Sequence, residues 1–233
     1  MARTNYHVSI TPLPGTEASS APYRDYYPVT LSNGAQLNLP IQPLPGGQEA
    51  IALLMSNQTS FEVEKELGSL LSKLAAEFSA EVIVGIPTLG LDYARLVARD
   101  LGFRDYVALG NSRKFWYSDE LSVPVHSVTS PGANKRLYLD PMLVERVAGK
   151  QALIVDDVIN TGGSAAAAIE LLQNAGALVI GLCVILIEGE AWKDTLASLS
   201  PNLPSRVRGL GQIPIFCSTA KGWIPLGDAT AAE

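Results

Sequence analysis

The sequence predicts an α/β protein built on a parallel sheet that helices cover on both faces. Two segments indicate this fold class, residues 81–109 and 153–187, because each runs from a strand-like apolar stretch through a helical stretch into a second strand-like one. The expected strands are nearly continuous apolar runs, which is typical of strands buried on both faces. A chain of 233 residues is long enough to form one substantial α/β domain.

The first β-α-β unit occupies residues 81–109. Residues 81–86 form a short β-rich run, and apolar residues then recur at helical spacing as far as Gly102, a residue type that commonly ends helices. Residues 106–109 resume an extended pattern. We therefore expect two neighbouring strands joined by one helix.

The second unit begins within residues 151–164, which read QALIVDDVINTGGS. The apolar run 152–155 predicts a buried strand that ends at two adjacent acids, Asp156 and Asp157. Adjacent carboxylates at the edge of a core repel each other and lose hydration, so a cation or a group of hydroxyls is expected to compensate them. An alanine-rich helix follows, and the chain returns as a strand over 178–187.

The N-terminal third predicts a smaller structure attached to the sheet. Residues 27–31 and 36–41 flank an Asn-Gly pair, which is a strong hairpin signal. Thr59 followed three residues later by Glu62 has the pattern of a capping box, and a helical apolar period follows it from Phe61.

Residues 111–149 form a long insertion between the two units. The insertion is polar, aromatic and proline-bearing, and such long insertions in compact domains are typical of functional loops or lids. Residues 1–25 lack a period and predict a loosely packed arm.

Composition excludes several classes of protein. Seventeen Lys and Arg against 23 Asp and Glu give a net charge of −6, so the chain has no overall positive field for nucleic acid or an anionic membrane. Its apolar stretches are too short to span a bilayer, and the opening residues lack the apolar core of a signal peptide. We expect a cytoplasmic protein whose two cysteines are reduced.

The residues from Thr161 to Ser164 predict a phosphate site. They form a turn that opens a helix, where free backbone N–H groups, hydroxyls and the helix dipole suit an anion. In open parallel sheets, ligands bind beyond the carboxyl ends of strands, and this turn and residues 85–90 both fall there. Because carboxylates accept hydrogen bonds from vicinal hydroxyls, Asp156, Asp157 and the turn together suit a sugar phosphate.

The segment ALIVDDVINTGGS resembles the phosphoribosyl pyrophosphate (PRPP) binding motif of the type I phosphoribosyltransferases. That motif has four apolar residues, two acids, two apolar residues, a small or polar residue, Thr-Gly-Gly and a hydroxyl residue, and all 13 positions are in register here. Adenine and other purine phosphoribosyltransferases are the most similar type. The resemblance implies their fold, a Rossmann-like parallel sheet flanked by helices, with a small hood and a flexible lid loop.

The resemblance also implies roles for individual residues. Asp156 and Asp157 would bind the ribose hydroxyls, contact Mg²⁺ indirectly through water and substrate, and act in catalysis with Arg113 and Lys114. The 5′-phosphate site would comprise Val158, Asn160, Thr161, Gly162, Gly163 and Ser164. The pyrophosphate loop would comprise Pro87, Thr88, Leu89 and Gly90. Lys135, Arg136 and Tyr138 would lie on the lid.

These roles imply a Mg²⁺-dependent transfer of the phosphoribosyl group from PRPP to a nitrogenous base, with a purine as the expected class, and release of pyrophosphate. The expected division of the chain is an arm and hairpin over 1–45, a core over 46–194 and a C-terminal segment over 195–233 that packs on the core or hood. The expected partners are small-molecule substrates and a second copy of the chain, with no nucleic acid and no membrane.

Two alternatives to this function stay open. Adenine-type enzymes carry a basic residue before the final glycine of the pyrophosphate loop, where this chain has Leu89, and an acid where it has Pro87. Leu89 favours a non-catalytic regulator that binds PRPP or a nucleotide on the same fold. A hydrolase or phosphorylase that acts on a ribosyl phosphate is the other alternative.

Overall fold

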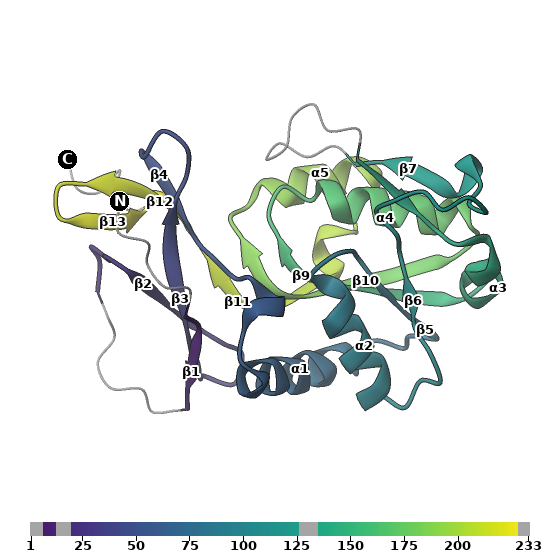
Figure 1. Ribbon diagram of the computed structural model, residues 1–233, viewed down its shortest axis with the longest axis horizontal. Coiled ribbons are helices and arrows are strands. Elements are labelled where there is room, and N and C mark those ends of the chain that lie inside the picture. The colour runs from purple at the N-terminus through teal and green to yellow at the C-terminus, as the bar shows by residue number, and fades with distance from the viewer. Residues whose placement is uncertain (1–6, 13–19, 126–134, 228–233) are drawn as a thin grey trace.

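Two sheets lie side by side in the computed structural model, which describes residues 7–12, 20–125 and 135–227 (Figure 1). The larger body is built on a five-stranded parallel sheet with the strand order β11-β10-β9-β5-β6. Its strands are β5 (Val82–Gly85), β6 (Val107–Ala108), β9 (Gln151–Ile159), β10 (Leu178–Glu188) and β11 (Val207–Ile213). The predicted α/β class with a parallel sheet is confirmed.

Helices cover both faces of this sheet, which explains why its strands are apolar almost without interruption. Helices α1 and α2 pack together on one face, and α4 and α5 lie on the other with the β7–β8 ribbon. The helices are α1 (Phe61–Ala75), α2 (Gly90–Asp100), α3 (Val144–Val147), α4 (Gly163–Asn174) and α5 (Ala191–Leu199). The ribbon strands and short 3-10 turns are β7 (Ser122–Pro124), β8 (Arg136–Tyr138), η1 (Ser56–Gln58), η2 (Asp119–Leu121), η3 (Pro141–Leu143) and η4 (Pro204–Arg206).

Strand β9 shows how the sequence divides the two cores. Successive side chains of a strand point to opposite faces of its sheet. Leu153 and Val155 accordingly enter the core under α1 and α2, whereas Ala152 and Ile154 enter the core under α4. All four side chains are completely buried, so β9 is the central strand of the body and its carboxyl end is fixed on both sides.

The second sheet is antiparallel and forms a hood next to the carboxyl edge of the parallel sheet (Figure 1). Its strand order is β1-β3-β4-β12-β13, with β2 paired to β3. The strands are β1 (Ser9–Thr11), β2 (Tyr26–Thr30), β3 (Gln36–Pro43), β4 (Glu49–Ala52), β12 (Ile215–Thr219) and β13 (Gly222–Pro225). The chain therefore builds the hood from segments near both of its ends.

The predicted hairpin is confirmed as β2 and β3, which pair antiparallel through Val29 and Leu37. Gly34 adopts a φ of 81° in the connecting turn, a conformation that glycine enters without a steric penalty. The hood contacts β11 closely, because a Cβ atom on Gly211 would lie 2.7 Å from a Val29 methyl carbon. A backbone hydrogen bond of 2.7 Å from Ser32 to Leu210 joins the same two elements.

Three local predictions are wrong. The strand does not end before the acids, because β9 continues through Asp156 and Asp157 to Ile159, where β10 still provides a hydrogen-bonding neighbour. The residue that caps α1 is Ser60 rather than Thr59, since the Ser60 hydroxyl accepts a hydrogen bond from the Val63 amide. Phe61 was expected on the apolar face of this helix and is instead 86% exposed.

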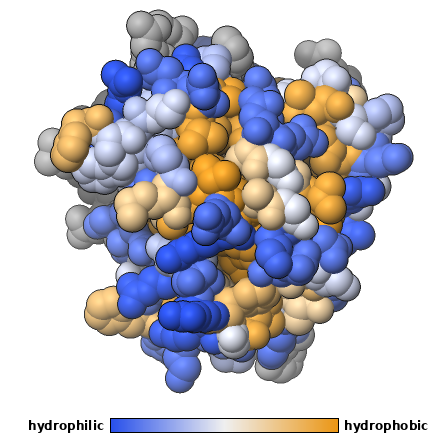
Figure 2. Space-filling model, turned by 90° about the vertical axis from the view of Figure 1, so that its right-hand side faces the viewer, coloured by the Kyte–Doolittle hydropathy of each residue, from blue (hydrophilic) through white to orange (hydrophobic). Residues whose placement is uncertain are grey.

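The cysteines Cys183 and Cys217 are both free, as predicted. In the described part of the chain, no helix has both the length and the apolarity that crossing a bilayer requires. Figure 2 shows the face at the right of Figure 1, where apolar residues gather toward the centre between hydrophilic ones.

Candidate functional site

The acid pair lies where one neighbour of β9 ends and the other continues. Strand β5 pairs with β9 as far as Gly85 and Val155, whereas β10 stays paired through Ile159. Asp156 is therefore the first residue of β9 beyond the end of β5. This step in the sheet edge opens space beside the acids, at the carboxyl edge where ligands bind in open α/β sheets.

Asp156 is almost fully buried, with 9% of its surface exposed. Its Oδ1 atom accepts a hydrogen bond of 2.9 Å from the Asp157 backbone amide. The first turn of α2 approaches it closely, because a Cβ atom on Gly90 would lie 2.6 Å from Oδ1 and 2.8 Å from the Asp156 Cα. Glycine at position 90 is what allows α2 and the segment before it to contact the acid pair.

Burial, followed by the negative charge of Asp157, raises the pKa of Asp156 well above its ordinary value. Burial also raises the pKa of Asp157, and a hydrogen bond with Asp156 partly opposes that rise. Both carboxylates are thus short of the hydration they have in water. A ligand that brings hydroxyl donors or a cation would replace that hydration and favour the ionised pair.

The predicted phosphate turn opens α4. Gly162 is the residue before the helix, with a φ of 79°, so the first amides of α4 point out of the helix end. A hollow of about 160 Å³ lies at this end. It is lined by Asp156, Val158, Ile159, Asn160, Thr161, Gly162, Gly163, Ser164, Ala165 and Leu182. All six residues predicted for the 5′-phosphate line this one hollow together with Asp156, whereas Asp157 lies beside it without lining it.

Residues outside the predicted site support the turn from β10 and α5. Asn160 donates a hydrogen bond of 2.5 Å from Nδ2 to Oε2 of Glu188, which is 5% exposed. The Thr195 hydroxyl donates to the Thr161 carbonyl at 2.7 Å. Trp192 packs under the turn, since a Cβ atom on Gly162 would lie 3.2 Å from the Trp192 Cα.

The segment predicted as the pyrophosphate loop connects β5 to α2. It contains a cis peptide between Pro87 and Thr88 and ends at Gly90, beside Asp156. The Thr88 hydroxyl accepts a hydrogen bond of 3.3 Å from Asn111, which follows β6. The loop and the acid pair are therefore neighbours, as the prediction requires. Leu89 is half-buried and provides no positive charge.

Arg113 and Lys114 follow Asn111 closely and are both exposed. The Arg113 side chain lies 3.2 Å from Asp119, so its guanidinium is engaged within its own loop. The structure thus places the two basic residues near the segment 87–90 without directing Arg113 at it.

The residues predicted for a lid lie at or in strand β8. Arg136 binds Ser122 of β7 through several hydrogen bonds, one of 2.8 Å from Nη2 to Oγ. Tyr138 is buried, and its backbone pairs with Gly110 at 2.8 Å. Lys135 is exposed directly before the strand. The ribbon that contains Arg136 and Tyr138 is packed against α4 rather than being a free loop, and residues 126–134 lie outside the described residues.

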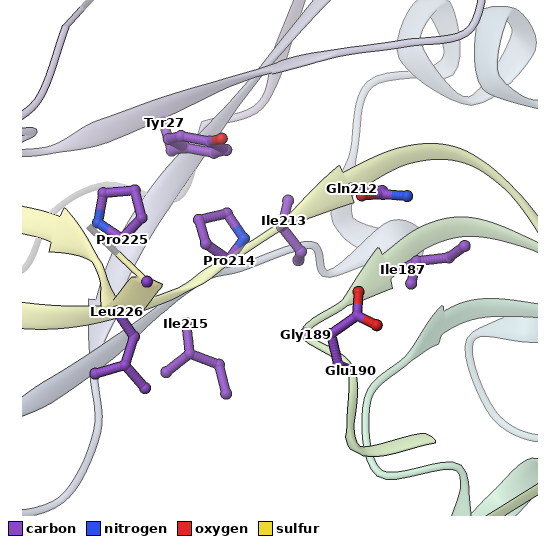
Figure 3. A pocket seen from close by; sticks show the side chains of 11 residues that line it. Tyr27, Ile187, Gly189, Glu190, Gln212, Ile213, Pro214, Ile215, Pro225 and Leu226 are labelled. Carbon is purple, nitrogen blue, oxygen red and sulfur yellow. The ribbon is translucent and has the colours of Figure 1, made fainter. Parts of the chain in front are cut away.

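A second cavity, of about 500 Å³, lies between the hood and the parallel sheet. Figure 3 shows Tyr27, Pro214 and Pro225 on its hood side, with Ile187 and Glu190 on the side of the parallel sheet. Glu188 ends β10, two residues before Glu190 in the wall of this cavity, and it contacts Asn160 in the wall of the phosphate hollow. The two spaces therefore lie at the ends of the neighbouring strands β10 and β9. No local sequence pattern could have predicted the cavity, since its walls come from four distant segments.

The site therefore offers three kinds of environment along one edge of the sheet. An amide-lined hollow suits a phosphate, two poorly hydrated carboxylates suit hydroxyls or a cation, and a mainly apolar cavity suits a flat organic group. A phosphorylated sugar with a ring system attached or about to be attached combines all three.

Comparisons with known proteins agree with this geometry. The sequence pattern of the family described as "Phosphoribosyl transferase domain" matches residues 58–200. The chain is 28% identical over 128 residues to a hypoxanthine/guanine phosphoribosyltransferase of Methanosphaerula palustris, which covers 55% of this chain and 65% of that relative. It is 29% identical over 136 residues to an adenine phosphoribosyltransferase of Sulfurimonas denitrificans, which covers 58% of this chain and 70% of the relative.

A solved adenine phosphoribosyltransferase from Thermoanaerobacter pseudethanolicus shares the fold with a TM-score of 0.53 and 18% identity, over 65% of this chain and 81% of that one. The family pattern covers more than half of the chain, whereas the match to the Methanosphaerula relative spans less than two thirds of that relative's length. The chain belongs to the phosphoribosyltransferase family of pentosyltransferases and has its type I fold.

Proposed function

We propose that this protein transfers the phosphoribosyl group of PRPP to a nitrogenous base in a Mg²⁺-dependent reaction that releases pyrophosphate, with a purine as the expected class of base. The observation that carries the proposal is the shared hollow, in which the buried Asp156 and the phosphate turn line one space. A surface acid beside an ordinary helix start would have no reason to be desolvated there.

In this proposal the turn from Asn160 to Ser164 binds the 5′-phosphate through backbone amides and hydroxyls. Asp156 and Asp157 accept hydrogen bonds from the ribose hydroxyls, and this interaction replaces the water that both carboxylates lose on folding. The segment 87–90 then lies on the side of Asp156 where the pyrophosphate would extend, because Gly90 touches Asp156.

The reaction breaks the bond between C1 of the ribose and the pyrophosphate oxygen, which leaves with the electron pair. The lone pair of a base nitrogen forms the new bond to C1, and the proton of that nitrogen is released to solvent or to the departing pyrophosphate. Positive charge develops on the ribosyl group and negative charge on the leaving group, so catalysis consists of positioning and electrostatic stabilisation. The acid pair stabilises the positive ribosyl group, and backbone amides of the segment 87–90 bind the leaving group.

The described residues fit the way in which Mg²⁺ is bound at such sites. Mg²⁺ is commonly held by one or two carboxylates, several waters and substrate phosphates rather than by a dense protein cage. Asp156 and Asp157 provide two carboxylates, and no cluster of three or more acidic, histidine or cysteine ligands occurs among the residues described. These two residues would hold the ion through water and substrate, and the ion would neutralise charge on the pyrophosphate.

The cavity between the hood and the sheet is our candidate for the acceptor base. Its volume of about 500 Å³ lies within the range of small-molecule sites, and Tyr27 offers an aromatic ring that a base can contact. Gln212 and Glu190 are polar residues in its lining and could choose among bases by hydrogen bonding.

A second candidate is a regulator that binds PRPP or a nucleotide without turnover. Leu89 supplies no charge to the segment 87–90, and Arg113 is engaged with Asp119 rather than free to replace it. This candidate keeps the same phosphate hollow and acid pair, so binding alone does not distinguish it from an enzyme.

A base panel distinguishes the two candidates. The protein is incubated with PRPP, Mg²⁺ and each of adenine, hypoxanthine, guanine, xanthine, uracil and orotate, and pyrophosphate release is measured. We expect release with at least one base and loss of that release in the Asp156→Asn, Asp157→Asn double variant. Binding of PRPP with no release for any base would contradict the enzyme and favour the regulator.

Homodimer formation and a role in purine salvage are proposals that rest on the resemblance to adenine-type enzymes, and a cytoplasmic location is a proposal that rests on the sequence alone. Light scattering at several protein concentrations tests the first of them directly.

A further inference from the structure

We propose that Glu188 is a positioning residue for the phosphate turn, and that its buried carboxylate makes the binding of a phosphate monoester depend on proton uptake by the protein. The inference rests on the proposed function only in taking the hollow at 160–164 as a phosphate site. It concerns a residue outside the recognised motif, on the neighbouring strand.

The geometry ties Glu188 to the turn. Glu188 is the last residue of β10, and its carboxylate accepts a hydrogen bond of 2.5 Å from the Asn160 side chain. Asn160 is the first residue after β9 and lines the hollow. Because β10 is held on both sides by β9 and β11, Glu188 gives the start of the turn a rigid point of attachment.

The negative charge of the Glu188 carboxylate is neutralised by no nearby cation among the described residues. Glu188 is 5% exposed, and it has no ion-pair partner among the described residues. Burial raises its pKa to about 7, and the hydrogen bond from Asn160 only partly opposes that effect. A buried carboxylate that accepts one strong hydrogen bond and faces no cation readily takes up a proton near neutral pH.

The elements around Glu188 carry other charged groups. Strand β9 carries Asp156 and Asp157, the segment after β10 carries Glu190, Lys193 and Asp194, and β11 carries Arg208. Glu190 and Lys193 form an ion pair with each other at the surface. Arg208 donates to Ser205 and Val207 near the start of β11, at the opposite edge of the sheet from Glu188.

A phosphate bound in the hollow brings negative charge next to this carboxylate and therefore favours its protonated form. Phosphate affinity is therefore highest when Glu188 is protonated, below pH 7, and falls as pH rises through 7 and the carboxylate ionises. The second ionisation of a phosphate monoester, near pH 6, acts in the opposite direction and is nearly complete above pH 7. The two effects can thus be separated.

The test is calorimetric titration of the full chain with ribose 5-phosphate from pH 6.5 to pH 8.5, for the wild type, Glu188→Gln and Glu188→Asp. Gln has nearly the same shape as Glu and still accepts from Asn160, but it cannot ionise. Glu170→Gln, the same change at an exposed position of α4, is the matched control.

We expect wild-type affinity to fall about fivefold over this range if bound phosphate raises the pKa of Glu188 by one unit, which corresponds to a tenfold change at full ionisation. Glu170→Gln should behave like the wild type, and Glu188→Gln should lose the part of this fall that Glu188 causes, so that only the pH dependence of the ligand and of the acid pair remains. Glu188→Asp should bind more weakly throughout, because its shorter side chain does not reach Asn160.

The same dependence of affinity on pH in the wild type and in Glu188→Gln would overturn the inference, because the ligand and the acid pair are common to both proteins. The proposed function fails separately: if no base gives pyrophosphate release while the pH effect of Glu188 is present, the inference stands and the transferase does not. Absence of ribose 5-phosphate binding in the wild type would overturn both.

Discussion

Replacement of Glu188 by Gln should make the protein more stable at alkaline pH and have little effect at acidic pH. The pKa of this carboxyl is raised from an ordinary 4.5 to about 7 by burial. An acid whose pKa is higher in the folded than in the unfolded state lowers stability at pH values where the unfolded state is ionised, because the folded state disfavours the ionised form. That cost is absent below the unfolded pKa, grows as pH rises from 4.5 to 7, and is constant above 7.

The size of this effect on the free energy of unfolding follows from the rise in the pKa of Glu188. A difference of about 2.5 pKa units at about 1.4 kcal/mol per unit amounts to about 3 kcal/mol at pH 8, and less than about 1 kcal/mol remains at pH 5. Gln removes this ionisation and keeps an oxygen that accepts from Asn160. The free energy of unfolding of Glu188→Gln, relative to the wild type, should therefore rise by about 2 to 3 kcal/mol between pH 5 and pH 8.

Urea unfolding at several pH values measures this difference, and Glu170→Gln again provides the control for a lost surface charge. Any constant effect of the amide itself cancels, because only the change with pH is compared. A difference that stays constant from pH 5 to pH 8, or one that grows in favour of the wild type, would refute the argument that Glu188 is buried without compensation.

Three further changes test other parts of the site. Gly90→Ala should lower the free energy of unfolding by about 1 to 3 kcal/mol and weaken PRPP binding, since its Cβ would lie 2.6 Å from Asp156 Oδ1; wild-type values in both assays would contradict the contact. Thr195→Val should cost about 1 kcal/mol and weaken ribose 5-phosphate binding by removing the bond to the Thr161 carbonyl, and unchanged calorimetry would show that the turn needs no such support. Asp156→Asn should raise the melting temperature at pH 8 while weakening PRPP binding, because it removes a buried charge next to Asp157; a lower melting temperature would show that the charge is compensated.

Local patterns predicted the elements that depend on local chemistry. The Asn-Gly hairpin, both β-α-β units and the turn before α4 depend on periodicity, glycine conformation and helix starts, all of which are visible within a few residues. The end of β9 was misplaced because it depends on a neighbour: β10 extends further than β5 and keeps β9 hydrogen bonded past the acids. A polar residue can therefore lie inside a strand that periodicity would end.

The sequence did not identify the residues that support the phosphate turn, for a related reason. Glu188 looks like a polar residue at the end of an apolar strand, and Thr195 like an ordinary helical threonine, until the fold places them against Asn160 and Thr161. The hood cavity draws Tyr27, Ile187, Pro214 and Pro225 from separate parts of the chain. Such sites arise from the packing of distant segments, and one sequence carries no local signal for them.

The measurement that tests the central claim most directly is calorimetric titration of PRPP with Mg²⁺ into the wild type and into the Asp156→Asn, Asp157→Asn double variant. If the carboxylate pair and the amide-lined hollow hold one sugar phosphate between them, the wild type binds and the double variant loses at least tenfold in affinity, about 1.4 kcal/mol. Equal affinities for the two proteins would show that the acids take no part in holding the sugar.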